Sequence, residues 1–266
     1  FYIAEFSGWM IAYKYMALAM LVGIVTTLVI REPVILPREN FTEQPGHWLR
    51  HAVVSPFTEF FQRFGLHALV LLLFVSVYRI SDITMGVMAN PFYLDMGYSK
   101  TEIANVAKFF GFFMTIAGSA IGGLAVVKYG HYRCLLTGAV LVAGTNVLFA
   151  VMAQQPPDLL WLSLVISADN LSGGFANVAF IAYLSALVSR EFTATQYALF
   201  SSLMTLPGKF IGGFSGEVVD AFGYPVFFSY AALLGIPAIL LVIYIQRHQQ
   251  SGLPAKAAQA DAPANH

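Results

Sequence analysis

The residues best suited to chemistry in this sequence are charged side chains inside long apolar segments: Arg79, Asp82, Asp169 and Lys209. A charge inside a bilayer is costly, so it usually pairs with another charge or faces a cavity, and it often marks a path for solutes or protons. Arg79 and Asp82 stand three residues apart, on one face of a helix and close enough to pair. The alternative is that this pair only neutralises itself and holds helices together.

The two aspartates are expected at the same depth in the membrane. Counting about 1.5 Å of rise per residue from the centre of each apolar segment places Asp82 and Asp169 both roughly 6 Å toward one face, although the two segments run in opposite directions. The two carboxylates are therefore able to share one cavity.

A polar stripe runs along one face of the segment 159–187. Its members are spaced by four, three, four and three residues, and they are Ser163, Ser167, Asn170, Gly174 and Asn177. Such a face must contact protein or water, because hydrocarbon leaves amides without hydrogen-bond partners. The stripe either lines a pathway or makes hydrogen bonds between helices, and the sequence leaves both interpretations open.

Lys209 follows Pro207 and Gly208 near the middle of another apolar segment, where a proline loosens the helix. A lysine at such a point suits an anionic solute. Two rows of small residues at four-residue spacing predict tight helix packing. They are Gly208, Gly212 and Gly216 in one segment, and Gly111, Thr115, Ser119 and Gly123 in another.

The composition indicates an all-helical protein of the membrane. Hydrophobic residues make up 58% of the 266 residues and charged residues only 11%. The 14 basic and 14 acidic residues cancel, which gives no reason to expect a nucleic-acid partner. The sequence contains no zinc-binding HExxH motif, no phosphate-binding loop and no GxSxG nucleophile motif. No enzyme activity, catalytic residue, metal site or cofactor is therefore expected.

Seven apolar stretches are long enough to cross a bilayer as helices. They are residues 8–30, 66–89, 103–127, 133–153, 159–187, 197–218 and 224–245. Turn-forming sequences separate them, among them Asn90-Pro91 and Phe222-Gly223-Tyr224-Pro225.

The distribution of basic residues predicts the orientation. Nine of them fall in the linker, the tail and two loops on one side: Arg31, Arg38, Arg50, Arg63, Lys128, Arg133, Arg190, Arg247 and Lys256. The opposite side carries only Lys100. Because cationic loops resist translocation, the first side is expected to be cytoplasmic, and the C-terminus with it.

An internal repeat suggests two parallel halves. Gly8, Trp9, Tyr13, Tyr15, Ala17 and Leu18 match Gly223, Tyr224, Phe228, Tyr230, Ala232 and Leu233 at one offset of 215 residues. We therefore expect residues 1–30 to be the last helix of an N-terminal bundle, 31–65 a cytoplasmic linker, 66–246 a six-helix bundle, and 247–266 a disordered tail. The start at Phe1 predicts an internal fragment that lacks most of its first half.

Several segments together resemble the AmpG-type muropeptide permeases of the major facilitator superfamily. They are YRISD at 78–82, SKTEIANVAKFFG at 99–111, SADNLSGG at 167–174 and FTATQYALFSSL at 192–203. GLAVVKYGHYR at 123–133 resembles the cytoplasmic loop motif of that superfamily, with Val127 at its usual acidic position. The resemblance implies a permease of the bacterial inner membrane that imports anhydromuropeptides by proton symport.

Joined to the buried polar residues, this resemblance suggests a role for each of them. Substrate binding is expected from Tyr78, Arg79, Asn170, Asn177 and Lys209, with the two cations attracting carboxylates of an anionic peptide-sugar solute. Proton coupling is expected at Asp82 or Asp169. Two alternatives stay open: a related carrier of another anionic solute, such as acetyl-coenzyme A or a siderophore, and a non-transporting membrane partner.

Overall fold

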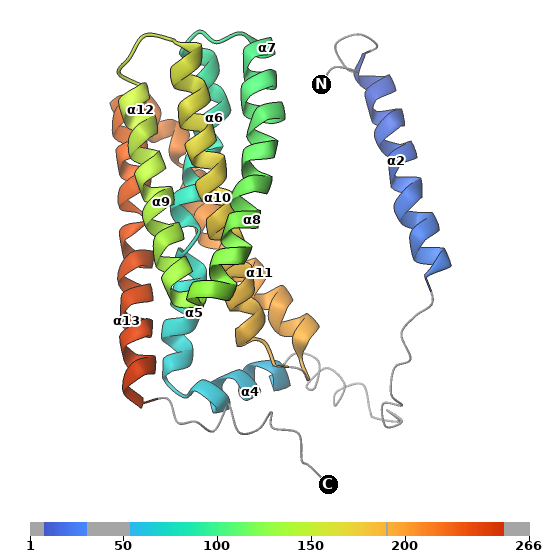
Figure 1. The fold of residues 1–266 in the computed structure, drawn as a ribbon, viewed down its shortest axis with the longest axis vertical. Helices are drawn as coiled ribbons and strands as arrows, with labels where there is room; N and C mark the ends of the chain where they lie inside the picture. The colour runs from blue at the N-terminus through green and yellow to red at the C-terminus, as the bar shows by residue number, and fades with distance from the viewer. Residues whose placement is uncertain (1–7, 31–53, 190, 253–266) are drawn as a thin grey trace. The chain divides into compact units, whose positions relative to one another are not determined.

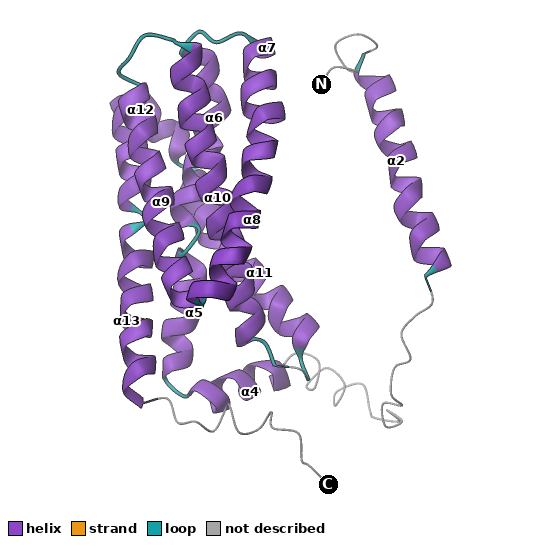
Figure 2. Ribbon diagram, in the orientation of Figure 1, coloured by secondary structure: helices purple, strands orange, loops and turns teal. Residues whose placement is uncertain are grey.

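The computed structural model describes residues 8–30, 54–189 and 191–252, and every regular element within them is a helix (Figure 2). The chain divides into two units, residues 1–51 and 52–266, which we describe separately. The first unit contains α2 (Trp9–Val29), shown in blue in Figure 1. Its 21 residues are enough to cross a bilayer, as the sequence predicts for 8–30. The hydroxyls of Thr26 and Thr27 donate to carbonyls one turn earlier, so neither is left without a partner.

The second unit is a helical bundle (Figure 1). In chain order its elements are α4 (Ser55–Phe64), α5 (His67–Val77), α6 (Ile80–Asp95), α7 (Lys100–Ile103), the π-helix η2 (Ala104–Phe110), α8 (Gly111–Tyr129), α9 (His131–Met152), α10 (Leu159–Leu187), α11 (Thr193–Gly212), α12 (Ser215–Leu233) and α13 (Ile236–Gly252). The all-helical fold class predicted from the sequence is confirmed.

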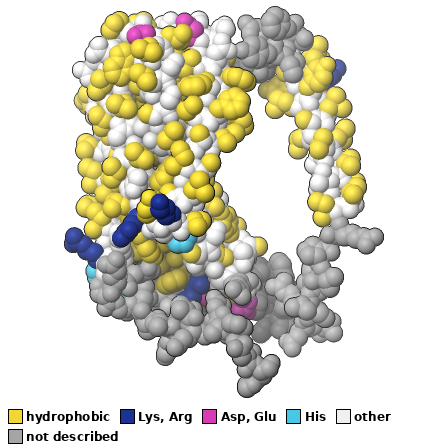
Figure 3. Space-filling model, viewed as in Figure 1, with side chains coloured by type: hydrophobic (Ala, Val, Ile, Leu, Met, Phe, Trp, Pro, Cys, Tyr) yellow, Lys and Arg dark blue, Asp and Glu magenta, His cyan; other side chains and the backbone are white. Residues whose placement is uncertain are grey.

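In the described part of the chain, six helical stretches are long and apolar enough to cross a membrane. They are Met10–Val29, His67–Asp95, Lys100–Tyr129, His131–Met152, Leu159–Leu187 and Ser215–His248. The more polar α11, which matches the predicted segment 197–218, is not among them. Hydrophobic side chains cover most of the bundle face that Figure 3 shows. On this face the Lys and Arg side chains, in dark blue, lie toward the end of the bundle at which Figure 1 shows α4. The chain is therefore a multi-pass membrane protein.

Three of the predicted helices are broken rather than continuous. The segment 66–89 is α5 and α6, separated at Tyr78 and Arg79, and α6 continues through Pro91 to Asp95. The segment 197–218 ends as α11 at Gly212, and α12 begins at Ser215. The last segment breaks again between α12 and α13. Local periodicity did not predict these breaks, because the residues on both sides of each one are apolar and helix-compatible.

The predicted turn at Gly223 is present as a kink. Gly223 has φ 78° and ψ 168°, and Gly8 has φ 81° and ψ 159°. Glycine adopts such left-handed backbone conformations without a steric cost. The two glycines that the internal repeat aligns therefore make the same local turn, whereas the division into two parallel halves stays a prediction. Helix α13 runs to Gly252, into the predicted tail, and the remainder of that tail lies outside the described residues.

Two apolar clusters fill the bundle and leave a polar layer between them. One contains Phe74, Tyr78 and Phe180 among its buried residues. The other contains Met85 and Phe149. Along the broken helix α5–α6 the polar residues from Arg79 to Asp82 stand between the two clusters. The packing therefore places Arg79, Ser81 and Asp82 at the level between the two apolar clusters.

Helices α8 and α10 approach each other closely at glycines, two of which are on α8. A Cβ at Gly118 would overlap the carbonyl oxygen of Leu171, and one at Gly122 would lie 2.9 Å from that of Phe175. The predicted tight face on α8 is confirmed at Gly111, Thr115 and Ser119, which lie against Asn170 and Gly174 of α10. It does not extend to Gly123, where an added Cβ would have no contact closer than 3.9 Å, to Val178. In the other row, Gly208 and Gly212 pack against Ile83 and Val87 of α6, whereas a Cβ added at Gly216 would meet no atom of another element within 4 Å.

Helix α4, the described part of the predicted linker 31–65, is held against the bundle by Gln196 of α11. The side chain of Gln196 is 1% exposed. Its Nε2 donates to the Pro56 carbonyl at 3.0 Å and to Glu59 at 2.7 Å, and its Oε1 accepts from the Ser189 N–H at 2.8 Å. Phe60 packs its ring on Phe200 at 5.3 Å between centroids.

We expect Gln196→Ala to release α4 from the bundle. The substitution leaves buried partners unpaired, at a cost of about 1–3 kcal/mol. Tryptic cleavage after Arg63, whose side chain pairs with Glu59 at 3.3 Å, should accelerate. Gln62→Ala, on the exposed side of α4, is the control and should leave cleavage unchanged. Equal cleavage rates in both variants would show that Gln196 does not hold the helix.

Candidate functional site

The break between α5 and α6 presents Arg79 to the interior of the bundle. The Tyr78 N–H makes the last bond of α5, to the Phe74 carbonyl at 3.0 Å. Arg79 then leaves helical geometry, with φ −103° and ψ 4°, and α6 begins at the next residue. Asp82 lies in the first turn of α6, where the positive end of the helix dipole favours an anion.

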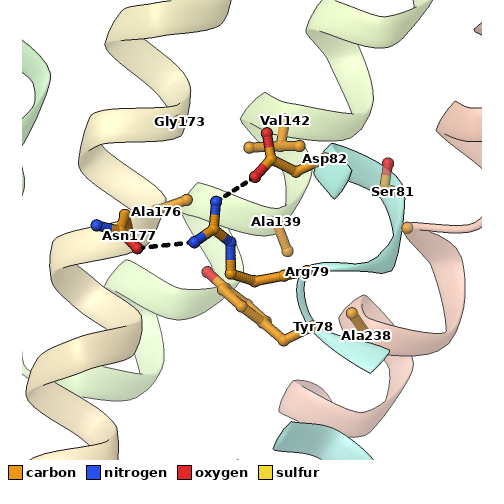
Figure 4. A pocket seen from close by; sticks show the side chains of 11 residues that line it. Tyr78, Arg79, Ser81, Asp82, Ala139, Val142, Gly173, Ala176, Asn177 and Ala238 are labelled. Carbon is orange, nitrogen blue, oxygen red and sulfur yellow. Dashed lines mark hydrogen bonds and ion pairs between the residues drawn. The ribbon is translucent and has the colours of Figure 1, made fainter. Parts of the chain in front are cut away.

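Arg79 has two partners within the bundle, drawn as dashed lines in Figure 4. Its Nη2 forms an ion pair with Asp82, and its Nη1 donates to the side-chain oxygen of Asn177 at 3.1 Å. The side chains of Arg79 and Asp82 remain 27% and 28% exposed. The predicted pairing at three-residue spacing is confirmed. A guanidinium carries five N–H donors in a planar fork, so Arg79 retains donors for a carboxylate.

These residues line a pocket where four parts of the fold meet (Figure 4). Its lining comes from the α5–α6 break (Tyr78, Arg79, Ser81, Asp82), α9 (Ala139, Val142), α10 (Gly173, Ala176, Asn177) and the α12–α13 break (Gly235, Ala238). The cavity volume of about 20 Å³ has room for roughly one or two water molecules. In this conformation the pocket admits water or a small group, but not a peptide-sugar molecule.

Tyr78 is fixed in place at the edge of this pocket. Its ring stacks on Phe180, with 4.5 Å between centroids and 13° between planes. Its hydroxyl donates to the Leu135 carbonyl at 3.1 Å. Tyr78 therefore forms a rigid wall beside Arg79, and its one hydroxyl hydrogen is already used.

Asp169 lies near the pair but does not line the pocket. It accepts a hydrogen bond from Thr145 at 3.3 Å. The sequence predicts that both aspartates can share one cavity, but of the two only Asp82 lines this pocket.

The polar stripe of α10 is divided between two neighbours. Asn177 turns to Arg79, whereas Asn170 accepts from Thr115 of α8 at 2.9 Å and donates to its own helix at Ile166 at 2.9 Å. At Gly174 the backbone of α8 is in close contact. The sequence left two interpretations of the stripe open, hydrogen bonding between helices and the lining of a pathway. Asn170 makes a hydrogen bond between helices, whereas Asn177 lines the pocket.

Lys209 is not part of this site. Its side chain is exposed on α11, and it does not line the pocket. Helix α11 also continues through Pro207 and ends only at Gly212. The break in this predicted segment therefore comes after Lys209. Among the described residues, no group of three or more His, Cys, Asp or Glu side chains is placed to hold a metal ion.

Three polar residues near the site were not predicted: Ser81, Thr145 and Asn146. Ser81 lines the pocket, and it contacts Asn146 and the Ala231 carbonyl. Serine, threonine and asparagine are common in membrane helices, so their types alone did not single them out. Gly235, which precedes Ile236 and Pro237, was a usable signal for the second break.

Comparison with known proteins, like the fold, indicates a helical membrane protein. The family model of the Major Facilitator Superfamily matches residues 2–212 and, in a second alignment, 71–266. The putative transporter AmpG 4 of Rickettsia felis is 29% identical over 248 residues, 92% of this chain and 59% of that protein. The anhydromuropeptide permease of Escherichia coli K12 is 28% identical over 238 residues, 89% of this chain and 47% of that protein. An uncharacterized protein of Haemophilus influenzae is 35% identical over 253 residues, 92% of this chain and 58% of that protein.

The chain thus spans about half to three-fifths of the length of the curated relatives it matches. Two of these relatives are named as a transporter and a permease, which agrees with the expectation that the chain is not an enzyme. Its family match, helical fold and apolar spans are mutually consistent. The chain belongs to the major facilitator superfamily, and within it resembles the AmpG-type permeases.

Proposed function

We propose that this chain is the C-terminal part of a proton-coupled permease that imports an anionic peptide-sugar solute, an anhydromuropeptide, across the bacterial inner membrane. The observation that carries the proposal is the Arg79–Asp82 ion pair at a helix break inside the bundle. The name of the Escherichia coli relative supports the solute class.

In the proposed mechanism, Asp82 and a solute carboxylate compete for Arg79. With Asp82 ionised, the guanidinium is engaged by the ion pair and by Asn177. When Asp82 takes up a proton it loses its charge, and the pair weakens. Arg79 is then available to bind a solute carboxylate. Proton uptake at this site therefore promotes solute binding, and solute release favours proton loss.

The other predicted residues receive distinct roles in this proposal. Asp169, which accepts a hydrogen bond from Thr145, is the alternative proton-coupling site. Tyr78 and Asn177 hold Arg79 in position and contact the solute. Lys209 attracts the anionic solute from an exposed position on α11. Asn170 contributes through the packing of α8 on α10.

The proposal also includes the arrangement of the whole transporter. Residues 1–30 are its last N-terminal-bundle helix, 31–65 are a cytoplasmic linker, and 66–246 are the second bundle. The solute site in such transporters lies between two halves, so this chain acts together with a first half. The linker and the C-terminus face the cytoplasm, as the basic residues indicate.

Uptake of labelled anhydromuropeptide tests the proposal, in vesicles that contain the chain joined to the preceding bundle of its own gene. We expect uptake that an uncoupler abolishes. Arg79→Gln should lower it by about ten- to a hundredfold, the effect of losing a charge-assisted hydrogen bond of about 1.5–3 kcal/mol. Lys100→Gln, which removes one exposed positive charge, is the control. Uptake that ignores the uncoupler, or an Arg79 variant as active as the control, contradicts the proposal.

A further inference from the structure

Two helix breaks of the second unit meet at one pocket. The first separates α5 from α6 at Tyr78 and Arg79, and the second separates α12 from α13 at Leu234 and Gly235. Arg79 and Gly235 both line the cavity. A helix break leaves backbone groups without their regular partners, and a buried group of this kind must bond elsewhere.

At the second break, the Ser81 hydroxyl bonds to the Ala231 carbonyl, which lacks its regular helical partner. The Gly235 N–H bonds to the carbonyl of Ala232 at 3.0 Å, three residues back, rather than to that of Ala231. The Ser81 hydroxyl donates to the Ala231 carbonyl at 2.7 Å instead. Ser81 is 2% exposed and Ala231 is fully buried, so no water from the bulk replaces this bond. The first turn of α6 is thereby attached to the end of α12.

Asn146 of α9 completes the connection. Its Nδ2 lies 2.8 Å from the Ser81 Oγ. Because a hydroxyl has one hydrogen, and that of Ser81 goes to Ala231, the amide must be the donor. Asn146 is fully buried, so a weakened bond to Ser81 would leave its amide without a solvent partner. The three groups form one chain of hydrogen bonds across α9, α6 and α12, which we call the Asn146–Ser81 brace.

The brace is attached between the two charged residues of the site. Ser81 is two residues after Arg79 and directly before Asp82, in the first turn of α6. Gly235 stands against it, because a Cβ added at Gly235 would lie 3.6 Å from the Ser81 Oγ. Movement of one break away from the other would stretch the Ser81–Ala231 bond.

We propose that Asn146 and Ser81 are positioning residues for the Arg79–Asp82 site, which hold the α5–α6 break and the α12–α13 break at a fixed separation. Their effect on solute uptake rests on the proposed function, whereas their effect on the two breaks does not.

Ser81→Ala tests the brace by deleting one hydroxyl. Thr84→Val is the matched control, because the Thr84 hydroxyl is equally buried on α6 and has no hydrogen-bond partner among the described residues. Asn146→Leu, of similar size, provides a second variant. Hydrogen–deuterium exchange read by mass spectrometry follows peptides that cover 78–83 and 231–238. We expect exchange in both peptides to accelerate about fivefold in the brace variants, as for the loss of one net hydrogen bond, and to stay unchanged in the control.

Uptake by the complete transporter supplies the second readout. In Ser81→Ala we expect KM to rise about fivefold with maximal rate within about twofold, because the charges remain but are misplaced. A purely structural defect would lower the maximal rate through loss of folded protein and leave KM unchanged.

The outcomes separate the two ideas. Absence of uptake in the unsubstituted transporter refutes the proposed function, and the exchange experiment then decides the brace by itself. Unchanged exchange at either break in the brace variants overturns the inference. Faster exchange together with an unchanged KM overturns the positioning role.

Discussion

Gly118→Ala should destabilise the bundle more than a glycine-to-alanine substitution at any other glycine of α8. The new Cβ would overlap the Leu171 carbonyl oxygen, which belongs to the backbone of α10 and cannot rotate away. Separating the two helices removes contacts along their whole interface, and overpacking of this kind costs about 1–3 kcal/mol or more. Thermal unfolding of the chain in detergent measures the effect.

Gly123→Ala is the control on the same helix. Its Cβ would have no contact closer than 3.9 Å, and alanine favours the helix over glycine by about 1 kcal/mol. We therefore expect this variant to be as stable as the unsubstituted chain, or slightly more stable. If Gly118→Ala unfolds at the same temperature as Gly123→Ala, α8 and α10 do not require a glycine at their crossing.

The second large effect is expected at the ion pair of the site. Asp82→Asn leaves Arg79 with a positive charge and without the carboxylate that it pairs with, and breaking a buried pair in this way is more costly than removing both partners. Because both side chains are more than a quarter exposed, we expect a loss of about 1–3 kcal/mol rather than the full cost of a buried charge. The double variant Arg79→Gln/Asp82→Asn should recover most of this stability and still lack uptake.

The pair Glu59–Arg63 on α4 is a matched control for that double-mutant cycle. Its side chains are 27% and 29% exposed, nearly the same as at the site, but they lie outside the apolar spans. We expect a coupling energy below about 1 kcal/mol there. Additive effects at Arg79 and Asp82 would mean that the two charges do not stabilise each other. If the double variant retained uptake, the pair would have only a structural role.

The sequence by itself determined the helical class, the approximate positions of six of the seven predicted spans, and the pairing of Arg79 with Asp82. All three depend on local geometry. A long apolar stretch must form a helix to satisfy its backbone in a membrane, and residues three apart on a helix are neighbours whatever packs around them. The family resemblance, carried by short motifs such as that at 78–82, was equally readable.

Only the tertiary structure decided which polar groups meet across helices. Asn170 and Asn177 share one stripe of α10, yet one faces α8 and the other faces Arg79. Ser81 and Ala231, 150 residues apart, are joined by a hydrogen bond, and the backbone of Leu171 selects Gly118 rather than Gly123 as the crossing point. Periodicity specifies the face of a helix, but neither the rotation of its neighbour nor the place where a helix breaks, because those depend on the packing of the whole bundle.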